Sequence, residues 1–168
     1  MRPGTDLLVA GIGNIFLTDD GFGVEVVNRL SHQAVPPGVR VADFGIRGVH
    51  LAYELLDGYA RLILVDAVPM GEPPGTVALI EPDRGEPDPG EEVPNVDAHS
   101  MSPEVVLATL DRLGGNLERV YVVACQPFSL DEGIGLSPPV AAAVEGAVDL
   151  CRQLLNDLLQ PAGKGISP

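Results

Sequence analysis

A glycine-rich turn between an apolar run and an amphipathic segment most constrains how this chain can fold. The run Leu-Leu-Val-Ala at 7–10 is typical of a buried strand, and Val24 to Leu30 carries apolar residues at helical spacing. In α/β proteins, a turn of this kind places free helix N–H groups beyond the end of a strand, where they commonly bind phosphate. Here the turn carries Asp19 and Asp20. Two carboxylates repel phosphate, so the turn favours a cation instead.

Strand-like and helix-like segments alternate along the whole chain. The expected strands lie at 6–12, 39–44, 62–65, 76–80 and 120–124. The expected helices lie at 21–31, 49–57, 102–113 and 137–158. This alternation predicts an α/β fold, and right-handed crossovers make it a three-layer αβα sandwich with a mainly parallel, twisted sheet. Ligands in such folds bind beyond the carboxyl ends of the strands.

The length of 168 residues fits one domain, which we expect to span residues 1–160 and to be followed by a disordered tail at 161–168. Within that domain, the stretch at 81–97 is rich in proline and acidic residues and has no apolar period. We interpret it as a long surface loop.

The formal net charge of −14 argues against nucleic acid or an anionic membrane as a partner. No run approaches the ~20 apolar residues of a membrane-spanning helix. The two cysteines, Cys125 and Cys151, form no closely spaced metal-binding pair, and their sparse use favours reduced thiols in a cytoplasmic protein. Cys125 follows the last expected strand, where a buried thiol is favoured over a ligand-facing one.

Metal-capable side chains lie next to three separate segments of the expected fold. Asp19 and Asp20 follow the first strand, Asp66 follows the strand at 62–65, and His99 precedes the helix at 102–113. The edge of a parallel sheet can bring such positions together. Two carboxylates and one imidazole suit Zn, Ni, Fe or Mn, and the ligand types alone do not select among these metals.

Each of these residues also has a purely structural interpretation. Asp20 is a candidate N-cap of the first helix, and we favour a structural role for Asp19. Asp66 is a candidate turn cap, and His99 can be an ordinary loop histidine. The other two histidines are less suited as ligands. His32 lies at the end of the first expected helix, where the helix dipole stabilises a cation, and His50 lies early in the next helix with no acidic partner nearby in the sequence.

A nucleotide-dependent enzyme of the doubly wound type is a rival hypothesis. A dinucleotide-binding turn requires a third glycine, and Phe16 occupies that position. The sequence also contains neither a P-loop lysine nor a Gly-x-Ser-x-Gly nucleophile turn. We therefore expect no nucleotide binding.

Four motifs in order resemble those of the hydrogenase maturation endopeptidases. They are the turn at 11–23, Leu-Val-Asp-Ala at 64–67, His99, and Ile-Gly-Leu-Ser-Pro at 134–138. The resemblance extends from about residue 7 to residue 158.

The resemblance implies an endopeptidase, of a family often grouped with aspartic-type peptidases, that removes the C-terminal tail of a nickel–iron hydrogenase large-subunit precursor after nickel insertion. It also implies that Asp20, Asp66 and His99 contact the metal and carry the catalysis. Nickel would come from the substrate, although other divalent metals could substitute. We expect a cytoplasmic monomer. The alternative is a non-catalytic nickel-sensing or chaperone module for hydrogenase assembly.

Overall fold

The structure, a computed structural model, describes residues 6–46, 48–82, 103–115 and 117–159. The strands are β1 (Leu7–Ile12), β2 (Val39–Gly45), β3 (Arg61–Ala67), β4 (Val77–Ile80) and β5 (Arg119–Cys125). The helices are the 3₁₀ helix η1 (Thr18–Gly21), then α1 (Phe22–Ser31), α2 (Gly48–Leu55), α3 (Pro103–Arg112) and α4 (Pro138–Leu159).

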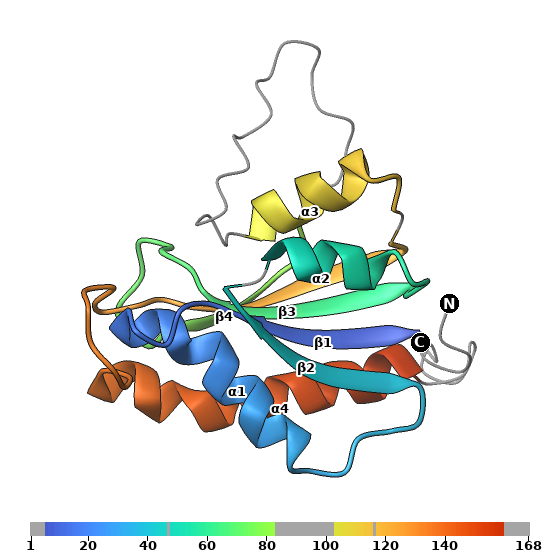
Figure 1. Ribbon diagram of the computed structural model, residues 1–168. Coiled ribbons are helices and arrows are strands. Elements are labelled where there is room, and N and C mark those ends of the chain that lie inside the picture. Colours follow the sequence, from blue (N-terminus) through green and yellow to red (C-terminus); the bar gives the residue numbers. More distant parts are fainter. Residues whose placement is uncertain (1–5, 47, 83–102, 116, 160–168) are drawn as a thin grey trace.

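The five strands form one sheet in the order β2-β1-β3-β5-β4 (Figure 1). β2, β1, β3 and β5 are mutually parallel, whereas β4 runs antiparallel to β5 at the edge. No crossover helix separates β3 from β4 in the described chain, so β4 returns in the opposite direction. The predicted mainly parallel α/β sandwich is therefore confirmed.

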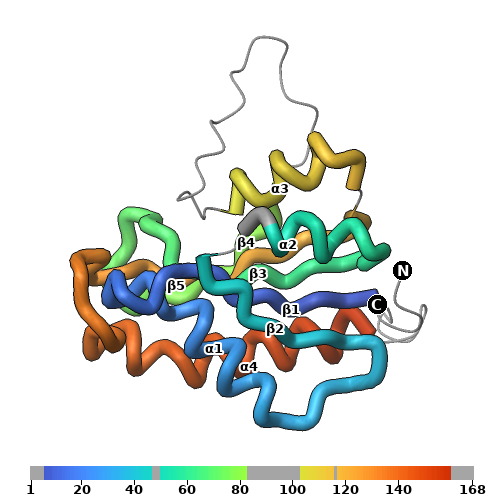
Figure 2. Tube along the Cα trace, in the orientation of Figure 1, coloured from blue at the N-terminus to red at the C-terminus, as the bar shows by residue number. Residues whose placement is uncertain are grey.

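Helices cover both faces of the sheet (Figure 2). Alternate residues of β1 and β3 point to opposite faces, because side chains of a strand alternate. Val9 and Ile63 pack with α1 and α4, whereas Leu8 and Leu62 pack with α2 and α3. Both central strands are thus covered on both sides, as their continuous apolar runs predict.

Glycine allows α1 to lie directly against the sheet. A Cβ added to Gly23 would stand 2.1 Å from the carbonyl oxygen of Val65 in β3 and 2.6 Å from that of Ile12. A Cβ on Gly11 would stand 2.3 Å from the carbonyl oxygen of Gly23. The glycines of the first turn therefore serve close packing between helix and sheet, and they hold the start of α1 beside the end of β3.

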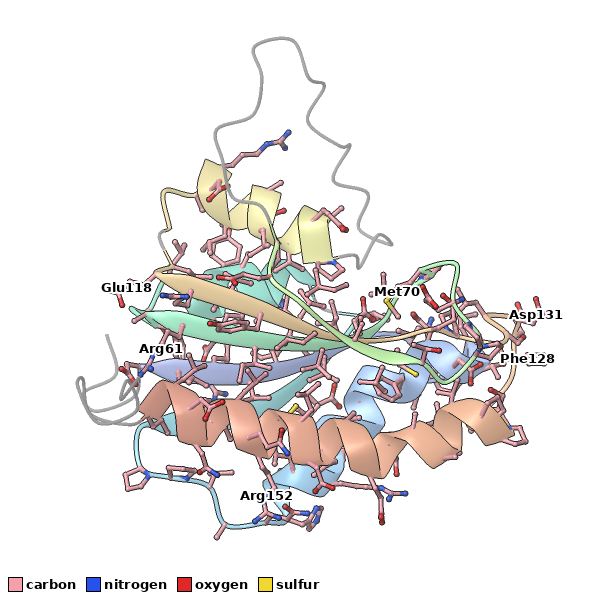
Figure 3. All side chains as sticks on the ribbon, turned by 180° about the vertical axis from the view of Figure 1, so that it is seen from behind. Arg61, Met70, Glu118, Phe128, Asp131 and Arg152 are labelled. Atoms are coloured by element: carbon pink, nitrogen blue, oxygen red, sulfur yellow. The ribbon has the colours of Figure 1, made fainter. Side chains whose placement is uncertain are left out.

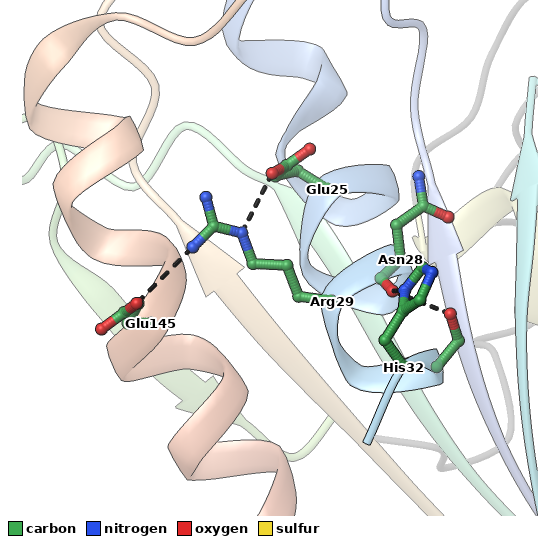
Figure 4. Close-up of polar contacts among 6 residues, drawn as sticks. Glu25, Asn28, Arg29, His32 and Glu145 are labelled. Carbon is green, nitrogen blue, oxygen red and sulfur yellow. Dashed lines mark hydrogen bonds and ion pairs between the residues drawn. The ribbon is translucent and has the colours of Figure 1, made fainter.

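The predicted first helix differs from the observed one at its start. The expected helix at 21–31 is preceded by η1, so that Asp19 and Asp20 lie in a 3₁₀ turn and not in a simple loop. The outer surface of α1 carries an ion pair between Arg29 and Glu25, and Arg29 also reaches Glu145 of α4 (Figure 4).

Three other expectations concern the chain outside the described residues. The tail at 161–168 and most of the loop at 81–97 lie there, and the single-domain boundary at 160 stays a prediction.

None of the helices in the described ranges has the length and apolarity that crossing a bilayer requires.

Candidate functional site

Asp20 lies in η1, just beyond the carboxyl end of β1. Its carboxylate accepts a hydrogen bond of 2.7 Å from the backbone N–H of Asn14, in the loop that leaves β1. The N-cap position of α1 belongs to Gly21, and no side chain caps that helix. The N-cap interpretation of Asp20 is therefore wrong. Its half-buried carboxylate is held by the loop of the first motif instead.

Asp66 is the penultimate residue of β3 and lies at the same edge of the sheet. β1 and β3 are parallel neighbours, with Gly11 opposite Val65, so the two strands end together. Its side chain is 4% exposed and takes a hydrogen bond from the backbone of Ala67. This bond agrees with the structural interpretation of Asp66, but it uses only one of the acceptor positions that a carboxylate offers.

The charge of Asp20 acts on the carboxyl group of Asp66. Burial raises the pKa of Asp66 well above its usual range, and the charges of Asp20 and Glu104 raise it further. Burial also raises the pKa of Asp20, against the opposing effect of the Asn14 hydrogen bond. Among the described residues, the ion pairs involve neither acid. A buried acidic pair without a counter-charge is a site that a cation stabilises.

The donor set fits a divalent metal only in part within the described chain. Asp20 and Asp66 provide carboxylate oxygens, which suit first-row metals. The third predicted ligand, His99, lies outside the described residues. In the described ranges, no group of three or more His, Cys, Asp or Glu side chains is arranged to hold a metal ion. The three-residue site thus stays a prediction, of which the structure describes two members at one edge of the sheet.

Asp19 has a different role from its neighbour. It is fully buried and accepts hydrogen bonds from the backbone N–H groups of Phe128, Ser129 and Ser137, at 2.8, 2.9 and 2.7 Å. The Ser137 hydroxyl donates a further bond of 2.8 Å. Burial alone would raise the pKa of Asp19, but these hydrogen bonds hold it below its usual value. Asp19 therefore joins the loop after β1 to the loop after β5, in agreement with the favoured structural role.

The remaining candidates do not join the acidic pair. His32 ends α1 and contacts the Asn28 carbonyl oxygen through Nδ1 at 2.6 Å, and Figure 4 shows this pair on the helix. His50 is exposed on α2. Cys125 is fully buried, and burial with the charge of Asp19 raises the pKa of its thiol to about 11. An inert buried thiol is the result, as expected.

Two features of this edge escaped the sequence analysis. Glu104, in the first turn of α3, adds its charge to that felt by Asp66. Several large apolar side chains of the loops after β1 and β5 are also exposed, among them Phe16, Phe128 and Ile134. Phe128 and Ile134 lie in a loop otherwise rich in Ser, Gly and acidic residues. Large apolar side chains in such a loop were the sequence pattern that could have predicted an exposed apolar surface.

Comparison with known proteins identifies one family of relatives. The family model described as "Hydrogenase maturation protease" matches residues 24–153. The chain is 34% identical to the hydrogenase expression/formation protein HupD of Bradyrhizobium diazoefficiens, covering 90% of this chain and 78% of that protein. It is 35% identical to a putative hydrogenase maturation protease of Methanocaldococcus jannaschii, covering 86% of this chain and 93% of that protein.

A solved structure shows the same fold. The hydrogenase maturating endopeptidase HybD from E. coli superimposes with a TM-score of 0.73 at 30% identity, covering 92% of this chain and 94% of HybD. The match confirms the endopeptidase prediction at the level of the family. On the shared fold, the family model and these identities, the chain belongs to the hydrogenase maturation protease family.

Proposed function

We propose that this protein removes the C-terminal tail of a nickel–iron hydrogenase large-subunit precursor after nickel has been inserted. The observation that carries the proposal is the pair Asp20 and Asp66, which are buried or half-buried at one edge of the sheet without a described counter-charge. Membership of the maturation protease family supplies the class of reaction.

In this proposal nickel belongs to the substrate. The precursor brings the metal, and Asp20, Asp66 and His99 complete its ligand set during the encounter. Two oxygen donors and one nitrogen donor leave coordination positions for ligands from the precursor. Ionised together, the two buried acids are unfavourable, and the positive charge of a bound metal offsets this, whereas a precursor without nickel brings no such charge. The site therefore distinguishes a loaded precursor from an empty one.

The chemistry of peptide hydrolysis follows from the same residues. Bound nickel supplies Lewis-acid character at the scissile carbonyl. Asp20 is the better placed general base for water, because its side chain is half-buried whereas Asp66 is almost fully enclosed. Asp66 then serves mainly to hold negative charge beside the metal.

The test uses purified protein with nickel-loaded and nickel-free precursor, and mass spectrometry of the products. We expect loss of a short tail from the loaded precursor only. Asp20→Asn, Asp66→Asn and His99→Ala should each lower the rate at least about 100-fold. Asp57→Asn, an exposed acid that follows α2 at the opposite end of the sheet, is the matched control.

Normal cleavage by all three site variants would contradict the site assignment. Equal cleavage of loaded and empty precursor would contradict recognition of nickel. Stable binding of the loaded precursor without any mass loss would support the non-catalytic chaperone alternative instead.

A further inference from the structure

Exposed apolar side chains gather on two loops at the carboxyl end of the sheet. Phe16, in the loop after β1, is 59% exposed, and Phe128 and Ile134, in the loop after β5, are 68% and 80% exposed. Leu130 of the second loop is also exposed. We call these four residues the apolar loop surface. Figure 3 shows Phe128 at the end of the molecule opposite Arg61, which begins β3.

The two loops form one joined structure. The Gly133 N–H donates to the Phe16 carbonyl oxygen at 2.9 Å, and the Thr18 N–H donates to the Gly133 carbonyl oxygen at 2.9 Å. Thr18 adopts a positive φ of 52°, and its hydroxyl donates to the Asp131 carbonyl oxygen at 2.6 Å. A threonine is held in this conformation only where its surroundings enforce it. The exposure of the four side chains thus belongs to a defined surface.

Among the described residues, the charges around this surface are negative. Asp131 and Glu132 are exposed in the loop after β5, and Glu72 is exposed in the segment between β3 and β4. The arginines of the described chain lie toward the amino ends of the strands or in the later turns of the helices: Arg29, Arg40, Arg61, Arg112, Arg119 and Arg152. The described part of the carboxyl end is therefore apolar and acidic, and Figure 3 shows Asp131 and Phe128 at that end of the molecule.

We infer that the apolar loop surface docks a segment of the substrate that combines apolar side chains with lysine or arginine. This inference rests on the proposed function, because it names the part of the precursor that binds beside the acidic pair. Apolar side chains of the segment would cover the four exposed residues, and its cations would face Asp131 and Glu132. A second copy of this chain fits poorly, since two acidic rims would repel.

The position of the surface separates its role from that of the acidic pair. Asp19 fixes the loop after β5 to the turn that carries Asp20, so a segment docked on the loops lies at the same edge as the site. Contacts made there stabilise the bound precursor and the transition state equally. Uniform binding of this kind changes KM and leaves kcat almost unchanged.

The test combines two pairs of substitutions with a matched control. Phe128→Ser with Ile134→Ser removes the two most exposed apolar side chains, and Asp131→Asn with Glu132→Gln removes the acidic rim. The control is Tyr53→Ser, an aromatic residue that is 55% exposed on α2. All are assayed on nickel-loaded precursor for kcat and KM. Binding of the same precursor is measured directly in an Asp66→Asn background.

We expect the apolar pair to raise KM and the dissociation constant about tenfold or more, with kcat within about twofold. Asp131→Asn with Glu132→Gln should raise both constants less, by about three- to tenfold, and should flatten their dependence on salt. Tyr53→Ser should change neither. These side chains are exposed, so the variants should fold normally. If Phe128→Ser with Ile134→Ser does not fold, Asp131→Asn with Glu132→Gln still tests the docking surface.

Unchanged KM and unchanged binding in both pairs, with normal cleavage by the unmodified protein, would overturn the docking inference and leave the proposed function standing. Failure of the unmodified protein to cleave, together with precursor binding that is lost in both pairs, would reject the proposed function and retain the docking surface.

Discussion

Ser137 donates two hydrogen bonds to the carboxylate of Asp19, one from its backbone N–H at 2.7 Å and one from its hydroxyl at 2.8 Å. The two residues are 118 positions apart in the sequence. Ser137 immediately precedes α4, so this pair joins the first turn of the fold to the start of the last helix. The contact sets the positions of both loops that border the acidic pair.

The substitution Asp19→Asn tests this contact directly. Each carboxylate oxygen of Asp19 accepts at least one hydrogen bond from a backbone N–H. An asparagine would replace one of these oxygens with an NH₂ group, which cannot accept from the N–H that it faces. A buried donor would then lack a partner, which should lower the free energy of unfolding by about 3–5 kcal/mol. Urea unfolding of both proteins measures the change. Equal stability would show that the loops are held by other contacts.

Acid sensitivity follows from the same carboxylate. Since the folded-state pKa of Asp19 is lowered, its contribution to stability is present above the unfolded value of 3.8 and is lost as the pH falls through the folded value. Thermal unfolding from pH 6 down to about pH 2 should show this loss in the unmodified protein. Asp19→Asn should unfold with a weaker dependence on pH in that range.

Asp66 should behave in the opposite way. Its folded-state pKa is raised by burial and by the charge of Asp20, so the stability it contributes as a neutral acid is lost as the pH rises through that value. Asp66→Asn keeps an acceptor for the Ala67 N–H and removes the buried charge. Without metal at pH 7.5, this variant should be more stable than the unmodified protein by about 1–3 kcal/mol.

Calorimetry in the presence of a chelator checks the Asp66→Asn prediction, and cleavage assays on the same samples show the cost to activity. Asp57→Asn, at an exposed position, should leave the melting temperature within about 1 °C of the original. If Asp66→Asn is less stable than the unmodified protein, other groups of the folded state must offset the buried negative charge of Asp66.

A pair of glycine substitutions tests how α1 is seated. At Gly23, an alanine Cβ would meet the carbonyl oxygens of Val65 and Ile12, so α1 must move away from the sheet. We expect a loss of about 2–4 kcal/mol and slower cleavage, because Asp66 follows Val65 directly. Gly146 lies on the exposed side of α4 with no atom within 4 Å of a built Cβ. Gly146→Ala should stabilise by about 0.5–1 kcal/mol.

Chemical denaturation of both glycine variants gives the two free energies, and circular dichroism reports the helix content. A Gly23→Ala protein as stable as the original would show that the close contact between α1 and β3 is not required.

The fold was predictable where local pattern and burial agree. The apolar runs of β1 and β3 are buried on both faces, and this is why alternation of strands and helices sufficed to predict a mainly parallel sheet. The edge strand β4 is shorter and partly exposed, so its pattern carries no information on direction. Only the absence of a helix between β3 and β4 indicated that it turns back.

The candidate site was predictable in part for a geometric reason. Asp20 and Asp66 each follow or end a strand, and parallel strands end at one edge, so their shared location could be predicted from sequence. The contacts of Asp19 depend on a loop more than 100 positions away. Exposure of Phe128 and Ile134 likewise depends on how two distant loops meet, and no periodic pattern records it.

The hydrogen bonds around Asp19 have a consequence for how an encounter with a substrate proceeds. Because the free enzyme already holds both loops in one conformation, it loses little entropy on association. Under the proposed function, the tail of the precursor would then supply most of the rearrangement, and differences in its flexibility should govern how fast productive complexes form.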